Sequence, residues 1–120
     1  MAKSKQAKSH EFNDKQRKII KERDEYRCIF CTIEYRMEGA TYMDRTTMSV
    51  MHYISRKKGG LGIEQNGAYG CQWHHHMLDN GKDGHREEML KIFRQYLQSH
   101  YRDWDESKLT YDKWGFFKEV

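Results

Sequence analysis

Residues 50–81 read VMHYISRKKGGLGIEQNGAYGCQWHHHMLDNG and contain most of the side chains in this chain that can carry chemistry. The pattern predicts a strand, a glycine-rich basic loop, a second short strand and a helix. In that order the elements are expected over residues 47–54, 57–62, 67–71 and 73–78. Asn80 and Gly81 are expected to end the helix, because glycine readily adopts the left-handed backbone found after helices.

Two pairs of metal-type ligands frame this stretch. Cys28 and Cys31 lie upstream of it, and Cys71 and His74 lie within it. Two residues separate the members of each pair, so both side chains can reach one ion. Zn²⁺ prefers four thiolate or imidazole ligands in a tetrahedron, and the two pairs supply that number. The spacing predicts a structural zinc; the alternative is three buried thiols beside a chance histidine.

The composition predicts one small domain with a thin core, since only 37% of 120 residues are hydrophobic and 33% are charged. A bound metal would supply stability that such a core lacks. Three cysteines cannot all pair within one chain, and the first residues show no secretory pattern. A reducing, cytoplasmic location is therefore expected. No run is long and apolar enough to span a membrane.

The expected organisation is a disordered basic tail over 1–10, a domain over 11–102 and a C-terminal extension over 103–120. The net charge of +4 fits a polyanionic partner and a solvated basic surface equally well. The extension carries aromatic residues that either pack on the domain or contact a partner. They are Trp104, Trp114, Phe116 and Phe117.

Two helices are expected to flank the central stretch. The first runs from Asn13 or Asp14 to about residue 25, with Asn13 as N-cap and Gln16 as its capping-box partner. The second covers residues 87–101, where apolar side chains recur at helical spacing and predict a face that packs in the core. That face consists of Met89, Leu90, Phe93, Tyr96 and Leu97.

The order and spacing of several residues resemble those of the HNH endonucleases, which have the ββα-metal (His-Me finger) fold. The matching residues are His52, Arg56, Gly59-Gly60, Asn66 and Cys71-x-x-His74-His75. The phrase GGLGIEQNG…CQWHHHMLDNG is most similar to small HNH proteins encoded by bacteriophages. The resemblance covers about residues 16–100. It implies an α+β fold of the zinc-stapled ββα-metal type with flanking N-terminal and C-terminal helices.

The resemblance also implies a function, the metal-dependent hydrolysis of DNA phosphodiester bonds by nicking or cutting. His52 matches the general base of the family, and Asn66 matches the residue that holds the loop so that the base is aimed correctly. His75 matches the ligand of a catalytic Mg²⁺ or other divalent ion. Asp79, four residues after His75 and on the same expected helix face, is a second candidate ligand.

DNA is the implied partner, and Arg56, Lys57 and Lys58 are candidate contacts to its phosphates. Taken singly, these residues have simpler explanations. A basic run is usually a solvated loop, His52 alone would be a core histidine, and Asn66 before a glycine is a turn signal. Phage members of such families often lie near DNA-packaging genes, so the resemblance implies a packaging-linked nuclease role. If the protein is phage-encoded, its expected location is the cytoplasm of the bacterial host cell.

Two positions depart from the family pattern. Met51 occupies the place before the base, where the family commonly has an aspartate or histidine that binds the catalytic metal, and a thioether does not suit Mg²⁺. His74 replaces a common cysteine and still suits zinc. Because of Met51, a catalytically weak or inactive zinc-stapled nucleic-acid-binding or protein-interaction module is the alternative function. His76 is expected on the surface. The sequence shows no recognisable subunit interface.

Overall fold

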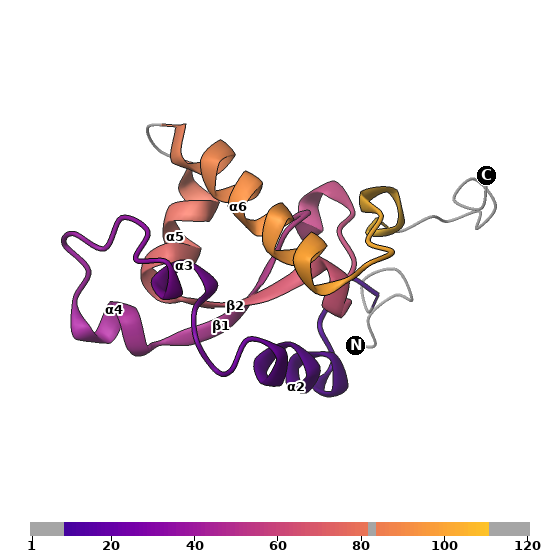
Figure 1. Cartoon of the computed structure of the whole chain (residues 1–120), viewed down its shortest axis with the longest axis horizontal. Coiled ribbons are helices and arrows are strands. Elements are labelled where there is room, and N and C mark those ends of the chain that lie inside the picture. The colour runs from indigo at the N-terminus through magenta and orange to yellow at the C-terminus, as the bar shows by residue number, and fades with distance from the viewer. Residues whose placement is uncertain (1–8, 82–83, 111–120) are drawn as a thin grey trace, which may run out of the picture.

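The computed structural model describes residues 9–81 and 84–110 of the chain. In chain order the elements are α2 (Asp14–Arg23), α3 (Ile29–Thr32), α4 (Tyr42–Thr46), β1 (Met48–His52), the 3-10 helices η1 (Arg56–Lys58) and η2 (Glu64–Asn66), β2 (Gly67–Cys71), α5 (Gln72–Asn80), α6 (His85–His100) and the 3-10 helix η4 (Glu106–Lys108). The protein is a small α+β structure with a two-stranded sheet and helices on both sides of it (Figure 1).

The sheet pairs β1 and β2 antiparallel, with Met48 opposite Cys71 and His52 opposite Gly67. Successive side chains of a strand point to opposite faces of the sheet. Met51 therefore faces α6, where it packs with Phe93, whereas His52 faces the other side of the sheet, where its ring contacts Phe12 just before α2. The predicted second strand has the observed bounds, and the first strand is shorter than the predicted span of 47–54.

The larger core lies between the sheet and α6. Met89, Phe93 and Leu97 are fully buried there, packed in one cluster with Met51 of β1 and Ala68 of β2. Leu90 and Tyr96 are partly buried against the same cluster. The predicted apolar face of this helix is thus confirmed as core, although the helix begins and ends slightly earlier than expected.

The opposite face of the sheet is covered by α2. Its predicted N-cap is confirmed, because the side chain of Asn13 accepts a hydrogen bond from the backbone N–H of Gln16 at 2.8 Å. The capping-box role expected for Gln16 is wrong, since its Oε1 accepts from the backbone N–H of Glu64 at 2.6 Å. The side chain of Gln16 therefore ties α2 to η2 and does not close the helix end.

Gly67 is the point of closest approach between β2 and α2. A Cβ at this position would lie 2.6 Å from the ring of Phe12 and 2.8 Å from the side chain of Ile20. Both side chains are buried, so neither has room to move aside. The absence of a side chain at residue 67 lets Phe12 and Ile20 seal this face of the sheet.

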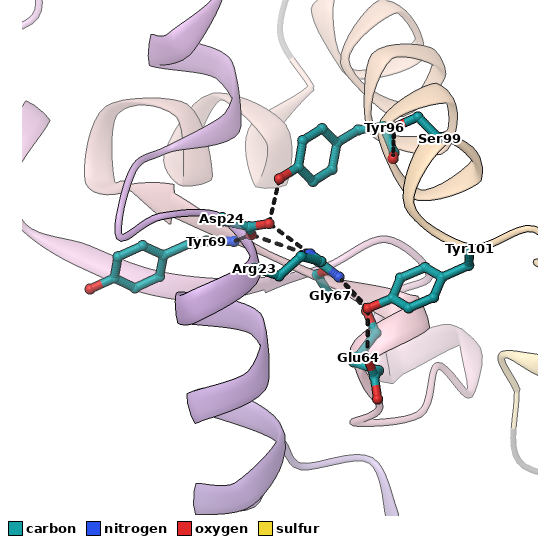
Figure 2. Close-up of polar contacts among 8 residues, drawn as sticks. All are labelled: Arg23, Asp24, Glu64, Gly67, Tyr69, Tyr96, Ser99 and Tyr101. Carbon is teal, nitrogen blue, oxygen red and sulfur yellow. Dashed lines mark hydrogen bonds and ion pairs between the residues drawn. The ribbon is translucent and has the colours of Figure 1, made fainter.

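A buried ionic network anchors the end of α2 (Figure 2). The guanidinium of Arg23 donates to both carboxylate oxygens of Asp24, at 2.7 and 3.0 Å, and to the carbonyl of Gly67 at 2.7 Å. The Asp24 carboxylate also accepts from the backbone N–H of Tyr69 and from the hydroxyl of Tyr96. The two charged side chains are 10% and 0% exposed. The network links α2 to β2 and α6.

Replacing Tyr96 by phenylalanine should destabilise the protein. The change removes one donor from a buried carboxylate, and hydrogen bonds to charged groups contribute about 1.5–3 kcal/mol. The free energy of unfolding, measured by urea denaturation, should fall by this amount. Tyr42→Phe is the matched control, because Tyr42 is 72% exposed. Equal stabilities of the two variants would show that Asp24 does not depend on the Tyr96 hydroxyl.

Segments between the main elements are more regular than expected. The sequence pattern predicts a tight loop over residues 27–32 and no clear element over 33–46, but the first span contains the short helix α3 and the second ends in α4. In the C-terminal extension, Leu109 is fully buried, and the indole N–H of Trp104 donates to the carbonyl of Gln65 at 2.7 Å. Trp114, Phe116 and Phe117 lie outside the described residues.

Residues 1–8 of the predicted tail also lie outside the described part, but His10, near the tail's end, is buried. None of the helices in the described ranges has both the length and the apolar surface that a membrane crossing demands.

Candidate functional site

Three cysteines and one histidine from three elements meet in one place. Cys28 is the N-cap of α3, and Cys31 lies within that helix. Cys71 is the last residue of β2, and His74 lies in the first turn of α5. Their ligand atoms all lie within 4.8 Å of one another, and four of the separations are 3.3–3.6 Å. A tetrahedron around an ion about 2.0–2.3 Å from each ligand has edges of roughly 3.5–3.8 Å. The four residues could therefore hold a metal ion.

The orientation of His74 supports this assignment. Its Nε2 lies within hydrogen-bond distance of the carbonyl oxygen of Tyr35, which can only accept. The proton therefore sits on Nε2, and the lone pair of Nδ1 points toward the three sulfur atoms. Metal-binding histidines commonly have their second ring nitrogen held by a carbonyl in this way.

The electrostatics of the cluster also favour a cation among the three sulfur atoms. The pKa of Cys28 is raised by its hydrogen bond with Cys71 and by burial, and burial raises the pKa of Cys31 to about 11. The pKa of Cys71 is lowered to about 3, chiefly by the Cys28 hydrogen bond. One thiolate is thus stabilised at the expense of the others. All three sulfurs can ionise together only with a positive ion between them.

A second group of candidate residues lines two adjoining hollows beside β1. The larger has a volume of about 810 Å³ and the smaller about 300 Å³. His52, Arg56 and His75 line both hollows. We call the larger hollow the β1 groove; its remaining lining residues are Glu11, Phe12, Arg17, Lys21, Met48, Ser49, Val50 and Tyr69. The structure thus brings together two histidines that are 23 positions apart in sequence.

His52 is held by the segment that precedes α2. Its Nε2 lies 2.7 Å from the carbonyl oxygen of His10, and its ring lies 4.3 Å from the ring of Phe12, centroid to centroid. The carbonyl can only accept, so Nε2 carries the proton and the neutral ring has its lone pair on Nδ1. Burial is the main cause that lowers the pKa of His52, and the positive charge of Arg56 adds to it. The ring is therefore neutral near pH 7.

Asn66 is fully buried and holds the loop that follows β1. Its Oδ1 accepts from the backbone N–H of Ile54 at 2.8 Å. Its Nδ2 donates to the carbonyls of Ile54 and Leu61, at 3.1 and 2.8 Å. Both ends of the loop that carries η1 are therefore fixed to one side chain.

The imidazole of His75 is oriented from both sides. Its Nδ1 lies 2.8 Å from the hydroxyl of Ser49, and its Nε2 lies 3.5 Å from a carboxylate oxygen of Asp79. An imidazole nitrogen that faces a carboxylate suits a cation between them, either a proton or a metal ion. His75 and Asp79 do not form a group of three metal ligands with His52. In the described ranges, the one group of three or more candidate ligands is the cluster of Cys28, Cys31, Cys71 and His74.

The predicted basic contacts are exposed but differ in position. Arg56 lies in both hollows and pairs with Glu11 at 3.6 Å, and Lys57 lines the smaller hollow. Lys58 lines neither of them. The turn after η1 requires Gly60, where a Cβ would lie 1.7 Å from the carbonyl oxygen of Ile54.

Met51 has no part in the groove. Its side chain is fully buried, and a Cβ on Gly70 would lie 2.3 Å from its sulfur. The family that the sequence resembles commonly has a metal ligand at this position. In this protein Met51 is a core residue, on the opposite face of the sheet from His52. Sequence reasoning identified the unusual residue but not that it points into the core.

Sequence reasoning missed the segment that holds His52. The sequence predicts a disordered tail that includes His10 and indicates no role for Phe12. His10 Nδ1 lies 2.8 Å from the carbonyl of Gly60, which fixes this segment to the loop after β1. An aromatic residue directly before a helix N-cap, here Phe12 before Asn13, is the one sequence signal for this segment.

Comparison with protein-family models, with curated proteins and with solved structures finds no match to this chain.

Proposed function

We propose that the protein is a metal-dependent endonuclease of the HNH type that hydrolyses DNA phosphodiester bonds. The observation that supports this function best is the placement of His52 and His75 in one groove, with Arg56 between the two hollows. The order strand, strand, helix that carries them corresponds to the ββα-metal arrangement that the sequence resembles. A neutral base, an ion-binding histidine and a guanidinium are the groups that phosphodiester hydrolysis needs.

Zinc is the ion we propose for the cluster of Cys28, Cys31, Cys71 and His74. Three thiolates and one imidazole form a closed set of four soft and borderline ligands, typical of structural zinc. The set leaves no open position for substrate. Its proposed role is therefore to hold α3 against the start of α5, the helix that also carries His75.

In the proposed reaction, His52 accepts the proton of the attacking water on Nδ1, while His10 holds Nε2. Asn66 keeps the loop after β1 in place, so Arg56 is presented to the phosphate. His75 and Asp79 would hold a divalent ion. Such an ion, when bound, stabilises negative charge on the phosphate and on the leaving oxygen.

The proposal is tested by plasmid cleavage with Mg²⁺ or Mn²⁺. The wild type should nick or cut, and His75→Ala should need a higher ion concentration and cleave roughly 10- to 100-fold more slowly at low concentration. His76→Ala, an exposed neighbour on the same helix, is the matched control and should cleave normally. Equal rates for both variants would remove His75 from the site. A zinc-loaded wild type that cleaves no form of DNA with any divalent ion would disprove the nuclease function.

One observation favours a second candidate, a zinc-stapled nucleic-acid-binding module without catalysis. Met51 is buried, so His75 and Asp79 would have to hold the divalent ion without a third ligand from β1. Metal titration separates the two functions. One tightly bound zinc and no second divalent site in the presence of DNA is the result expected of the non-catalytic module.

A further inference from the structure

We infer that α2 forms a second phosphate-binding arm, in which Arg17 and Lys21 contact the nucleic-acid strand that enters the β1 groove. The inference rests on the proposed function and adds the path of the substrate to it. The sequence resemblance assigns no role to this helix, and the basic residues considered from sequence all lie after β1.

The two side chains share one face of α2. They are four residues apart, so they lie one above the other on the helix, separated by about 6 Å along its axis. Both line the β1 groove together with His52 and Arg56. A nucleic-acid strand with a phosphate held by Arg17 or Lys21 could therefore extend along the groove to the place where His52 acts.

The electrostatic balance of the groove is positive. Its lining contains three permanent cations, Arg17, Lys21 and Arg56, and one acid, Glu11. Glu11 pairs with Arg56 at 3.6 Å, and Asp14 pairs with Arg17 at 3.7 Å on the exposed surface. Exposed pairs of this kind contribute little, so a phosphate can replace the carboxylates as partner. Lys21 is supported at the groove wall by Tyr69, whose ring centroid lies 6.0 Å from its Nζ.

The arrangement fits a strand better than a single small anion. A small anion is usually held by donors that converge on one point, with backbone N–H groups among them. Here the cations come from α2 and from η1, two elements separated in sequence by α3, α4 and β1. Charges spread along a groove are typical of proteins that follow a nucleic-acid backbone.

The helix itself offers a matched control. Lys15 and Lys18 are exposed on α2 but do not line the groove. Arg17→Gln/Lys21→Gln and Lys15→Gln/Lys18→Gln therefore remove the same charge from the same helix at different faces. Both double variants should keep the thermal midpoint of the wild type, which is checked first.

The experiment is fluorescence anisotropy with fluorescein-labelled DNA, single-stranded and duplex, without added divalent ion, so that cleavage does not intervene. Two lost contacts should weaken binding of the Arg17/Lys21 variant roughly 10- to 50-fold near 0.1 M salt and lower the slope of log K against log salt by about 1.8 on duplex. The Lys15/Lys18 variant should bind almost as the wild type does. The DNA form that binds more tightly and shows this pattern identifies the substrate of the groove.

Equal losses in the two double variants would overturn the inference, since the effect would then depend on total charge alone. A wild type that binds neither form of DNA would overturn it too. Failure of the nuclease function gives a different result, namely normal binding without cleavage in Mg²⁺. Normal cleavage and binding by Arg17→Gln/Lys21→Gln would leave the nuclease function intact and remove the α2 arm.

Discussion

Removing the metal from the cluster of Cys28, Cys31, Cys71 and His74 is expected to unfold the protein. Structural zinc sites in small domains contribute apparent free energies of about 10–16 kcal/mol. Whole domains are stable by only about 5–15 kcal/mol. The core here is small, and the cluster joins α3 to both β2 and α5. Without the ion, the three sulfur atoms cannot all ionise, and the four side chains lose the coordination bonds that would join α3 to β2 and α5.

The purified protein should contain one zinc per chain by mass spectrometry of its metals. A strong chelator should abolish the cooperative thermal transition seen by circular dichroism, and added Zn²⁺ should restore it. His74→Ala should behave like the chelated protein, because it removes a ligand that is fully buried. His76→Ala, two residues away and exposed, should keep the wild-type transition. A chelated protein with an unchanged thermal midpoint would contradict a structural role for the metal.

The second large effect is expected at His52, where replacement by glutamine should slow DNA cleavage by about 10²- to 10⁴-fold. Glutamine can still donate a hydrogen bond to the carbonyl of His10, so the segment before α2 should stay in place. It cannot accept the proton of water at neutral pH. A single-turnover cleavage assay with saturating protein measures the chemical step, and an unchanged thermal midpoint shows that the fold is kept. Cleavage at the wild-type rate would exclude His52 as the base.

The pH dependence of the wild type provides an independent check on His52. Burial lowers the pKa of this histidine below its ordinary value of 6.5. The base is active when neutral, so the single-turnover rate should rise with pH at acid values and reach half of its plateau below pH 6.5. A lowered folded pKa also means that the unfolded chain binds the proton more readily. The stability from neutral His52 is therefore complete above the unfolded pKa and is lost as pH falls through the folded pKa.

A rate that continues to rise through pH 7 to 8 would assign the limiting proton transfer to another group. The His52→Gln variant is the control for this measurement. Its residual rate should not show the rise with pH at acid values that the titration of His52 produces.

The fold was predicted best where it depends on neighbours along the chain. The bounds of β2 and the buried face of α6 follow from local patterns, because side chains two apart share a strand face and side chains three or four apart share a helix face. The four cluster residues were also predicted together. Their spacing in pairs is a local property, and the preference for four ligands joins the pairs.

Other features required contacts that no local pattern carries. The network of Arg23 and Asp24 consists of charges that a helix end would ordinarily expose to water. It is buried because Tyr69, Tyr96 and Tyr101 reach it from β2, α6 and the residue after α6. Similarly, the partner of His52 is a backbone carbonyl 42 positions away, and a carbonyl leaves no mark in the sequence.

The sequence by itself determined which residues could serve as metal ligands and which segments form β2, α5 and α6. Only the tertiary structure decided that Met51 points into the core, that His10 orients His52, and that Arg17 and Lys21 share a groove with the two histidines. The physical reason is that periodicity and spacing are set by bonds between neighbours. The direction of a side chain and the partners of a backbone group are set by packing between distant segments.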